Sequence, residues 1–335
     1  MSETVAVLGA GSFGTALAKL LAEGGHSVRL YARDASVAKS ITEEHVHPRR
    51  LKGVRLPPGL RAFTGIAEAV EGAGLVVSSV PTVAVREVWG EAGAALKEGA
   101  FVMSATKGIE SGTLKLVSQI LEESVPASAR DRLCYLSGPS FAAEMARRLP
   151  TAVTIAAYDE AVAAHVQGVI STDYFRAYTT TDVVGVELGG ALKNVIAIAA
   201  GTADGLGFGQ NTLAALVTRG LAEMARVATK MGARPLTLAG LAGMGDLVLT
   251  CMGSLSRNRT VGVQLGQGKK LDQILKDLGE VAEGVNTARS VNDLAKREGI
   301  EMPISSAVFR LLFENASPRD EVFALMGRKL KPEES

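Results

Sequence analysis

The segment Thr4-Val-Ala-Val-Leu-Gly-Ala-Gly-Ser-Phe-Gly14 decides the fold of this 335-residue chain. It begins with a short apolar run that predicts a buried strand, and it continues into glycines at the spacing GxGxxG. Residues 15–22 then have the pattern of a helix that ends at Gly24-Gly25. A second strand is predicted over Ser27–Tyr31. The segment therefore predicts a unit of strand, glycine loop, helix and strand.

Each glycine of the loop has a defined task in such a unit. Gly9 permits the tight turn, Gly11 lets the backbone approach a pyrophosphate, and Gly14 packs the helix on the strand. The pyrophosphate then lies at the helix N-terminus, where unpaired N–H groups point. A glycine loop that serves packing alone is the alternative. The setting between two strands favours dinucleotide binding and a Rossmann-type, doubly wound, mostly parallel sheet.

The end of the second strand, Tyr31-Ala32-Arg33-Asp34, bears on the choice of dinucleotide. An acid at this place normally binds the ribose of NAD, whereas an arginine accommodates the 2′-phosphate of NADP. Arg33 could meet that phosphate, and Asp34 could still reach a ribose hydroxyl. A solvated Arg–Asp pair in a loop is the alternative. The sequence favours NADP(H) and does not exclude NAD(H).

Polar residues follow the ends of several further predicted strands. These strands lie at 75–80, 101–104 and 133–136, and they run into Pro81, Lys107 and Gly138-Pro139-Ser140. In open α/β sheets the carboxyl ends of the strands form the ligand-binding edge. Lys107 is therefore a candidate ligand residue rather than a solvated loop lysine. Two closing strands, 151–156 and 174–178, are predicted around a helix at 160–170.

The pattern changes after Thr180, and no convincing strand follows. Asp182 is a candidate helix cap, and the segment after it is apolar nearly all round as far as Gly201, which predicts a buried helix. Its interior charge is Lys193, followed by Asn194. A buried ammonium is either paired structurally or has its pKa lowered so that it can transfer a proton. We expect domains at 1–181, for dinucleotide binding, and at 182–335, an all-helical domain for substrate and catalysis.

Two predicted loops of the second half carry unusual residues. Residues 240–246 are rich in glycine and end in Asp246, and residues 253–259 contain Ser256, Arg257, Asn258 and Arg259. Arginine, hydroxyl and amide groups ahead of a short helix suit a phosphate. An ordinary polar capping turn is the alternative, and the two arginines favour the anion site.

Composition limits the other possibilities. A net charge of +1 gives no overall field for nucleic acid or anionic lipid. The two cysteines, Cys134 and Cys251, lack metal or redox spacing, and no unbroken apolar run approaches about 18 residues, so a soluble cytoplasmic protein is expected. We expect no metal site, and we expect His45 and His47 to be solvated loop residues. No histidine falls in the second half, which leaves Lys193 as the leading acid–base group.

With these residues in view, the chain resembles the bacterial NAD(P)-dependent glycerol-3-phosphate dehydrogenases. The matching blocks run in order over nearly the whole chain: Val7–Thr15, Ala105–Ile109, Ser137–Ala142, Glu187–Asn194, Gly243–Leu247, Ser256–Asn258 and Val281–Val285. The resemblance implies a Rossmann-type domain, a helical C-terminal domain like that of 6-phosphogluconate dehydrogenase, and commonly a homodimer. The implied activity is reversible reduction of dihydroxyacetone phosphate by NAD(P)H to sn-glycerol 3-phosphate, the backbone for phospholipid synthesis.

The resemblance also implies roles for single residues. Lys193 would be the general acid–base. The cofactor would be bound by Ser12, Phe13, Arg33, Lys107, Ala142, Arg257, Val281 and Glu283, beside the glycine loop. The substrate would be bound by Lys107, Gly138, Ser140, Lys193, Asp246, Ser256, Arg257 and Asn258. Phe13 stands where many members carry tryptophan or tyrosine, and Arg50 replaces a more usual tyrosine, which leaves a cofactor contact from Arg50 open.

Two other functions stay open at this point. A β-hydroxyacid dehydrogenase of the 6-phosphogluconate type would share a Rossmann half, a helical half and a lysine, but it would turn over a carboxylate. A non-catalytic dinucleotide sensor would keep the fold with a structural Lys193. Oxidation of NAD(P)H in the presence of dihydroxyacetone phosphate would separate both from the favoured interpretation.

Overall fold

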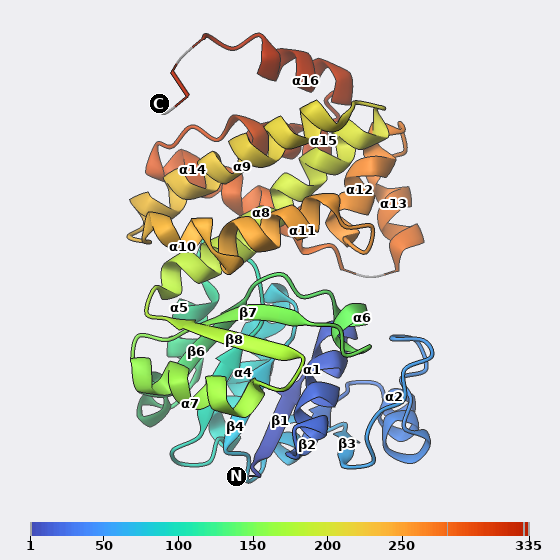
Figure 1. Ribbon diagram of the computed structural model, residues 1–335, viewed down its shortest axis with the longest axis vertical. Helices are drawn as coiled ribbons and strands as arrows, with labels where there is room; N and C mark the ends of the chain where they lie inside the picture. The colour runs from blue at the N-terminus through green and yellow to red at the C-terminus, as the bar shows by residue number, and fades with distance from the viewer. Residues whose placement is uncertain (1, 280, 331, 334–335) are drawn as a thin grey trace.

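The computed structural model describes residues 2–279, 281–330 and 332–333 and consists of two halves stacked along the long axis (Figure 1). The sheet half, residues 4–180, holds all the strands that the structure describes, and the helical half, residues 183–326, lies above it. The strands are β1 Thr4–Leu8, β2 Ser27–Tyr31, β3 Leu60–Phe63, β4 Leu75–Ser78, β5 Phe101–Ser104, β6 Leu133–Ser137, β7 Thr151–Ala156 and β8 Phe175–Thr180.

The eight strands form one sheet in the order β3-β2-β1-β4-β5-β6-β7-β8. Strands β1 to β6 are parallel, β7 runs antiparallel to β6, and β8 is parallel to β7. The order reverses between β1 and β4, which is where doubly wound sheets bind their ligands. The predicted fold class is confirmed. Strand β3 is not among the predicted strands, because Arg61 interrupts its short apolar run directly after a loop rich in proline, arginine and glycine.

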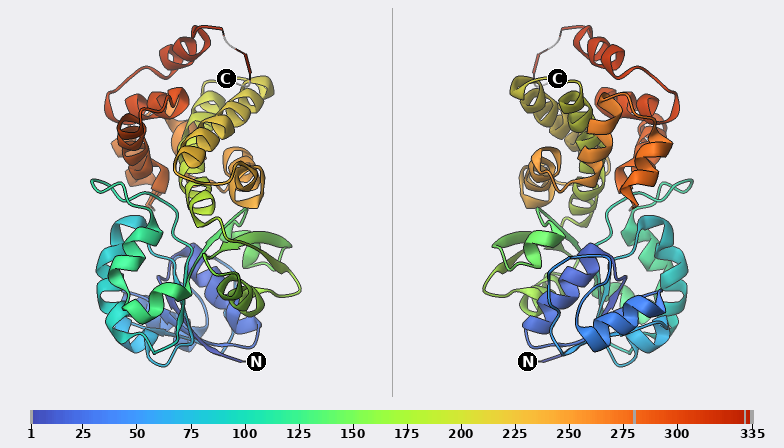
Figure 2. Two further views of the ribbon diagram at one scale, coloured as in Figure 1. Left: turned by 90° about the vertical axis from the view of Figure 1, so that its left-hand side faces the viewer. Right: turned by 90° about the vertical axis from the view of Figure 1, so that its right-hand side faces the viewer.

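Helices cover both faces of the sheet, as the side views show (Figure 2). One face packs against α1 Ser12–Glu23, α2 Ala35–Lys39, the π-helical turn η1 Ser40–Glu44 and α7 Glu160–Ile170. The other face packs against α3 Ile66–Val70, α4 Val85–Ala92 and α5 Val117–Ser124. Short turns η2 Thr82–Ala84, η3 Gly93–Ala95 and η4 Ala127–Arg132 and the helix α6 Ala142–Met145 complete this half. The fully buried Trp89 donates a hydrogen bond of 3.0 Å to Ser78 Oγ of β4.

The helical half is built around α8 Val183–Gly205. The other helices are α9 Gln210–Lys230, α10 Pro235–Ala239, the π-helical turn η5 Leu241–Gly245, α11 Asp246–Met252, α12 Arg257–Gly266, α13 Leu271–Leu278, α14 Glu283–Glu298, α15 Pro303–Phe313 and α16 Pro318–Met326. Asp182 caps α8 as expected, because its Oδ1 accepts a hydrogen bond of 2.9 Å from Gly185 N. Of residues 240–246, predicted as a loop, residues 241–246 are helical instead, and Gly245 N donates to Gly240 O at 3.1 Å to close the π turn.

Helix α8 is long and apolar enough to cross a membrane by length and composition alone. In the folded chain 83% of its most apolar window is buried inside the protein. Its apolar character is therefore that of a central core helix, surrounded by α9, α11, α12 and α14.

Helices α8 and α12 touch backbone to backbone. A Cβ atom added at Gly201 would lie 2.1 Å from Arg259 O, and one added at Gly262 would lie 2.1 Å from Ile198 O. The contact recurs one turn later. A Cβ atom added at Gly205 would lie 2.2 Å from Val263 O, and one added at Gly266 would lie 2.4 Å from Thr202 O. The paired glycines thus fix how closely α12, and the residues at its N-terminus, lie against α8.

We expect Gly262→Ala to lower the thermal unfolding temperature, because the new methyl group must push α12 away from α8. Overpacking of this kind costs roughly 1–3 kcal/mol and outweighs the gain of up to about 1 kcal/mol in helix propensity. The matched control is Gly168→Ala in α7, where a Cβ atom meets nothing within 4 Å. That variant should unfold at the same temperature as the parent or higher. A Gly262→Ala protein that gains stability like the control would contradict the close contact.

Candidate active site

The two lysines singled out in the sequence share one buried carboxylate. Lys193 Nζ lies 2.5 Å from Asp246 Oδ1, and Lys107 Nζ lies 2.6 Å from Asp246 Oδ2. Lys193 also donates to Thr250 Oγ1 at 2.8 Å, and Lys107 to Gly138 O at 3.4 Å. Only 7% of Lys193 and 2% of Asp246 is exposed. Segments more than fifty residues apart in the sequence therefore meet at one carboxylate.

The sequence Glu187–Asn194 of α8 explains why they can meet. A Cβ atom at Gly189 would lie 2.5 Å from Ala242 O, so this glycine admits the turn that leads into Asp246. A Cβ atom at Gly190 would lie 2.7 Å from Ser137 Oγ and 3.3 Å from Lys107 Cγ, so the second glycine admits Lys107. Lys193 follows one turn later on the same helix.

Glu187, at the start of this run, joins α8 to the sheet half. Its Oε1 accepts a hydrogen bond of 2.9 Å from Ser118 N in the first turn of α5. Burial raises the pKa of this carboxyl to about 7, although the bond from Ser118 opposes the shift. The contact anchors α8 beside the strand ends from which Lys107 comes.

Electrostatics set the protonation states of the lysine pair and its carboxylate. Burial, together with the charge of Lys107, lowers the pKa of Lys193 from 10.5 to about 8, while Asp246 opposes the shift. Burial alone would raise the pKa of Asp246, but the two ammonium groups outweigh it and hold that pKa below its usual value. Asp246 is therefore ionised at neutral pH, and Lys193 can gain or lose a proton close to neutrality.

The Ser256–Asn258 run lies at the N-terminus of α12, against α8. Ser256 Oγ caps the helix by accepting from Arg259 N at 3.2 Å. Asn258 donates to Asn194 Oδ1 at 2.9 Å and accepts from Gly284 N at 3.0 Å, so it joins α12 to α8 and α14. Arg257 donates to Val281 O at 2.8 Å.

The second arginine of this run has a different task. Arg259 Nη2 lies 2.7 Å from Asp204 Oδ2, and the pair ties α12 to the end of α8. Ser256 therefore caps a helix, as the alternative interpretation of this run expected. Because Arg259 pairs with Asp204, Arg257 is the arginine of the run that remains a candidate for binding an anion.

The loop Val281–Glu283 connects the halves on the other side. Glu283 Oε2 accepts a hydrogen bond of 3.2 Å from Thr82 Oγ1, in the turn that follows β4. Burial raises the pKa of Glu283, and the contacts with Thr82 oppose that shift. Two residues before it, Val281 is 44% exposed.

The glycine loop fits an anionic ligand. Gly9 has a φ of +113°, and a Cβ atom there would lie 2.7 Å from Ser79 O, so only glycine suits this turn. A Cβ atom at Gly14 would lie 2.0 Å from Gly9 O, whereas one at Gly11 meets nothing within 4 Å. Gly11 thus leaves open space in front of α1, whose N-terminus has no side-chain cap. A pyrophosphate can approach the first N–H groups of α1 at this point.

The other predicted ligand residues lie around this loop and the lysine pair. Ser12 and Phe13 form the first turn of α1, and Phe13 and Ala142 pack, partly buried, against the sheet core. Ser140 Oγ donates to Gly138 O at 2.9 Å, the carbonyl that also accepts from Lys107. Gly138 itself has a φ of +134°.

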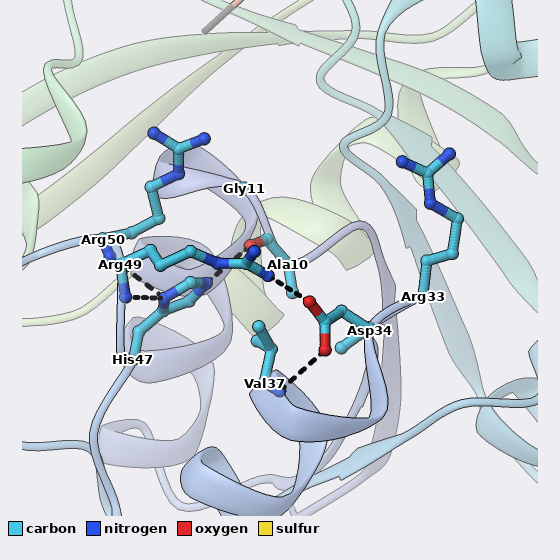
Figure 3. Close-up of a pocket in the computed structure, with 9 residues that line it drawn as sticks. Ala10, Gly11, Arg33, Asp34, Val37, His47, Arg49 and Arg50 are labelled. Carbon is cyan, nitrogen blue, oxygen red and sulfur yellow. Dashed lines mark hydrogen bonds and ion pairs between the residues drawn. The ribbon is translucent and has the colours of Figure 1, made fainter. Parts of the chain in front are cut away.

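Beside the glycine loop lies a cavity of about 420 Å³ with three arginines on its wall (Figure 3). Its lining residues are Ala10, Gly11, Ala32, Arg33, Asp34, Val37, His47, Arg49 and Arg50. Asp34 caps α2 by accepting from Ser36 N at 2.8 Å, and its other oxygen lies 2.5 Å from Arg49 Nη2. Asp34 therefore pairs with Arg49, which the sequence did not single out.

The expectation that His47 is a solvated loop residue is wrong. The ring is only 8% exposed, and Nε2 lies 2.9 Å from Ala10 O of the glycine loop. The sequence around His47, which is rich in proline and arginine, gave no sign of this burial. The reason is that the residue it contacts, Ala10, lies 37 residues away in the chain. Among the described residues no group of three or more histidine, cysteine or acidic side chains could hold a metal.

Thr250 and Thr82 are further residues of the site that sequence reasoning missed. Thr250 lies four positions after Asp246, so the i, i+4 spacing would have placed both on one face if the segment had been predicted as helix. Thr82 shows no comparable signal, because its partner Glu283 is 201 residues away.

Models of protein families match both halves of the chain. Residues 4–163 match the family described as NAD-dependent glycerol-3-phosphate dehydrogenase N-terminus, and residues 182–323 match the corresponding C-terminus. The chain is 54% identical over 327 residues to glycerol-3-phosphate dehydrogenase [NAD(P)+] of Anaeromyxobacter dehalogenans, covering 98% of each chain. It is 52% identical over 327 residues to the protein of that name from Myxococcus xanthus, again covering 98% of each.

Solved structures agree with these matches. A glycerol-3-phosphate dehydrogenase from Coxiella burnetii has a TM-score of 0.92 at 37% identity, over 98% of this chain and 99% of that one. A ketopantoate reductase from Ralstonia eutropha has a TM-score of 0.61 at 16% identity, over 95% of this chain and 99% of that one, and shares the fold alone.

Proposed function

The chain belongs to the family of NAD-dependent glycerol-3-phosphate dehydrogenases, and we propose that Lys193 exchanges the proton in its reaction. The protein is an NAD(P)-dependent oxidoreductase that interconverts dihydroxyacetone phosphate and sn-glycerol 3-phosphate. The observation that carries the proposal is the buried ammonium of Lys193, held by Asp246 and Thr250 with a pKa lowered to about 8.

The chemistry divides between the cofactor and the protein. NAD(P)H, when bound, supplies the hydride. Lys193 as an ammonium donates a proton to the carbonyl oxygen as it becomes a hydroxyl, and in the reverse direction the neutral amine takes the proton back. Lys107 adds positive charge beside the same oxygen. Asp246 keeps both nitrogens in place, because each of its oxygens accepts from one of them.

We infer that the phosphate of the substrate is bound at the N-terminus of α12. Ser256, Arg257 and Asn258 offer a hydroxyl, a guanidinium and an amide at this helix end, and Gly138 and Ser140 lie beside Lys107. Binding a phosphate remote from the carbonyl orients the reacting carbon, so part of this binding energy lowers the barrier.

For the cofactor, we propose that Gly9, Gly11 and Gly14 with Ser12 and Phe13 hold the pyrophosphate at the start of α1. Arg33 would meet a 2′-phosphate, which favours NADPH while NADH stays usable. Ala142, Val281, Glu283, Lys107 and Arg257 would complete the site. Residues 1–181 would thus bind the dinucleotide, and residues 182–335 would supply the acid–base and the substrate site.

We further propose a cytoplasmic homodimer that provides the glycerol backbone for phospholipids. The dimer is supported by an apolar ridge, defined as Met244, Val248, Met252 and Leu255, which are 43%, 38%, 53% and 52% exposed. The first three repeat every four residues along one apolar helical stretch, opposite the face that carries Asp246 and Thr250.

The size of the ridge suits a second copy of the chain. With Leu236 of the neighbouring α10, which is 82% exposed, its apolar area is on the order of 500 Å². That is about the apolar share of a standard interface, in which each partner buries roughly 800 Å².

Replacing Lys193 by methionine should lower the turnover of dihydroxyacetone phosphate by at least about 10²-fold, because the proton donor is lost. NAD(P)H binding should persist. In the parent, the rate of reduction should fall above a pH of about 8, since the donor must be an ammonium. The assay is NAD(P)H absorbance, with Lys39→Met, a lysine 69% exposed, as the matched control. Near-parent turnover of Lys193→Met would refute the assignment.

Replacing Arg257 by alanine should weaken dihydroxyacetone phosphate by roughly 10–150-fold, which corresponds to a charge-assisted bond of about 1.5–3 kcal/mol. The slow reaction of unphosphorylated dihydroxyacetone should hardly change. Arg259→Lys, which keeps a cation opposite Asp204, is the matched control. NAD(P)H affinity is measured separately by fluorescence titration. An equal loss for both substrates would show that Arg257 does not bind the phosphate.

Replacing Val248 by aspartate should convert the dimer into a monomer, because a charge would lie in the centre of the ridge. Sedimentation should then give the chain mass of 34.8 kDa instead of twice that value. Phe323→Asp in α16, where the side chain is 62% exposed outside the ridge, should leave the dimer intact. A monomeric parent, or dissociation by Phe323→Asp alone, would rule out the ridge as the interface.

A further inference from the structure

The imidazole of His47 joins two segments of the cavity wall (Figure 3). On one side Nε2 contacts Ala10 O, inside the glycine loop, at 2.9 Å. On the other side Nδ1 accepts from Arg49 N at 3.2 Å and from Arg50 N at 3.0 Å. Both ring nitrogens are therefore engaged, and they face two different segments.

These partners determine the form of the ring. Two backbone N–H groups point at Nδ1, so this nitrogen carries no proton, and the carbonyl of Ala10 requires a proton on Nε2. Burial lowers the pKa of His47, and the nearby charges of Arg50 and Arg49 lower it further. The hydrogen bond with Ala10 acts in the opposite direction and raises the pKa, but the net shift is downward. The neutral ring with its proton on Nε2 is the form that fits all three contacts.

The turn that this ring organises presents positive charge to the cavity. The N–H groups that Nδ1 accepts belong to Arg49 and Arg50, whose side chains line the cavity with Arg33. Asp34 offsets one of these charges by its ion pair with Arg49. Three guanidinium groups and one carboxylate line the cavity, and guanidinium groups suit the oxygens of a phosphate dianion.

We propose that His47 is a positioning residue that ties the arginine turn, Arg49–Arg50, to the glycine loop and so sets the preference for a dinucleotide with a 2′-phosphate. The inference rests on the proposed cofactor site. Because one rigid ring makes both contacts, the pyrophosphate end and the 2′-phosphate end of the site keep a fixed separation. A dinucleotide without the 2′-phosphate contacts only the pyrophosphate end of the site. Its affinity should therefore depend less on the two contacts of His47.

Three substitutions distinguish the contact of Nε2 with Ala10 from the contacts of Nδ1 with Arg49 and Arg50. His47→Asn keeps an acceptor near Nδ1 for the two N–H groups but is too short to reach Ala10 O. His47→Gln keeps a donor near Nε2 but lacks the acceptor near Nδ1. His47→Ala loses both. The proposal requires both contacts on one side chain, so all three should weaken NADPH selectively.

The measurement is the dissociation constant of NADPH and of NADH for each full-length protein, by calorimetry without substrate. His47→Ala should raise the dissociation constant of NADPH by about tenfold, which is the lower end of the loss expected when one arginine contact is misplaced. The dissociation constant of NADH should rise by no more than about threefold. Competition by 2′,5′-ADP should weaken in parallel, whereas competition by 5′-ADP should change little. Thermal unfolding of the free proteins shows whether each variant is folded.

The outcomes distinguish this inference from the function on which it rests. Arg33→Ala should weaken NADPH selectively, and equal losses for both dinucleotides in that variant would refute the proposed 2′-phosphate site itself. A selective loss in Arg33→Ala with equal losses in the folded His47 variants would overturn the role of His47 alone. A parent-like His47→Asn protein would show that the turn needs no tie to Ala10 and would also overturn it.

Discussion

The structure depends on one carboxylate that remains charged although it is almost completely buried. Asp246 is 2% exposed, and it can stay ionised because an ammonium faces each of its oxygens. Removing Asp246 would leave the two ammonium groups side by side without their counter-charge, which is strongly destabilising. Lys107 comes from the sheet half and Lys193 from the helical half, so the charge of Asp246 that opposes the lowering of the Lys193 pKa also holds the two halves together at this point.

Helix α8 allows Asp246 and the two lysines to come together, and its glycines are as important for this as its lysine. Glycines admit Lys107 and the turn before Asp246 at one end, and they admit the backbone of α12 at the other. Between them Asn194 binds Asn258 and so places the proposed phosphate site. The proposed acid–base, the carboxylate that holds it and the proposed substrate site are thus all positioned against one helix, which limits their relative motion.

The sequence was most informative where the chemistry is local. A glycine pattern between two strands predicted the sheet, and a lone lysine in an apolar helix singled out Lys193, which the fold brings into contact with Asp246. Contacts between distant segments were not visible in it. The pairing of Asp34 with Arg49, the burial of His47 and the bond between Thr82 and Glu283 each join residues whose proximity only the folded chain creates. The sequence also did not predict that Asp246 begins a helix, because three glycines within residues 240–246 suggest a loop.

That glycine-rich start is a π turn, which holds one residue more than an α turn. Deleting one residue there would restore an α turn and leave Asp246 in nearly the same direction. Adding a residue would instead rotate Asp246 by about 100° relative to Ala242, because an α-helix turns by that angle per residue. The close approach of Ala242 to Gly189 and the direction of Asp246 towards the lysines could not then both survive. Since a Cβ atom at Gly243 would lie 2.1 Å from Leu238 O, the turn restricts side-chain size at this glycine and does not admit an added residue.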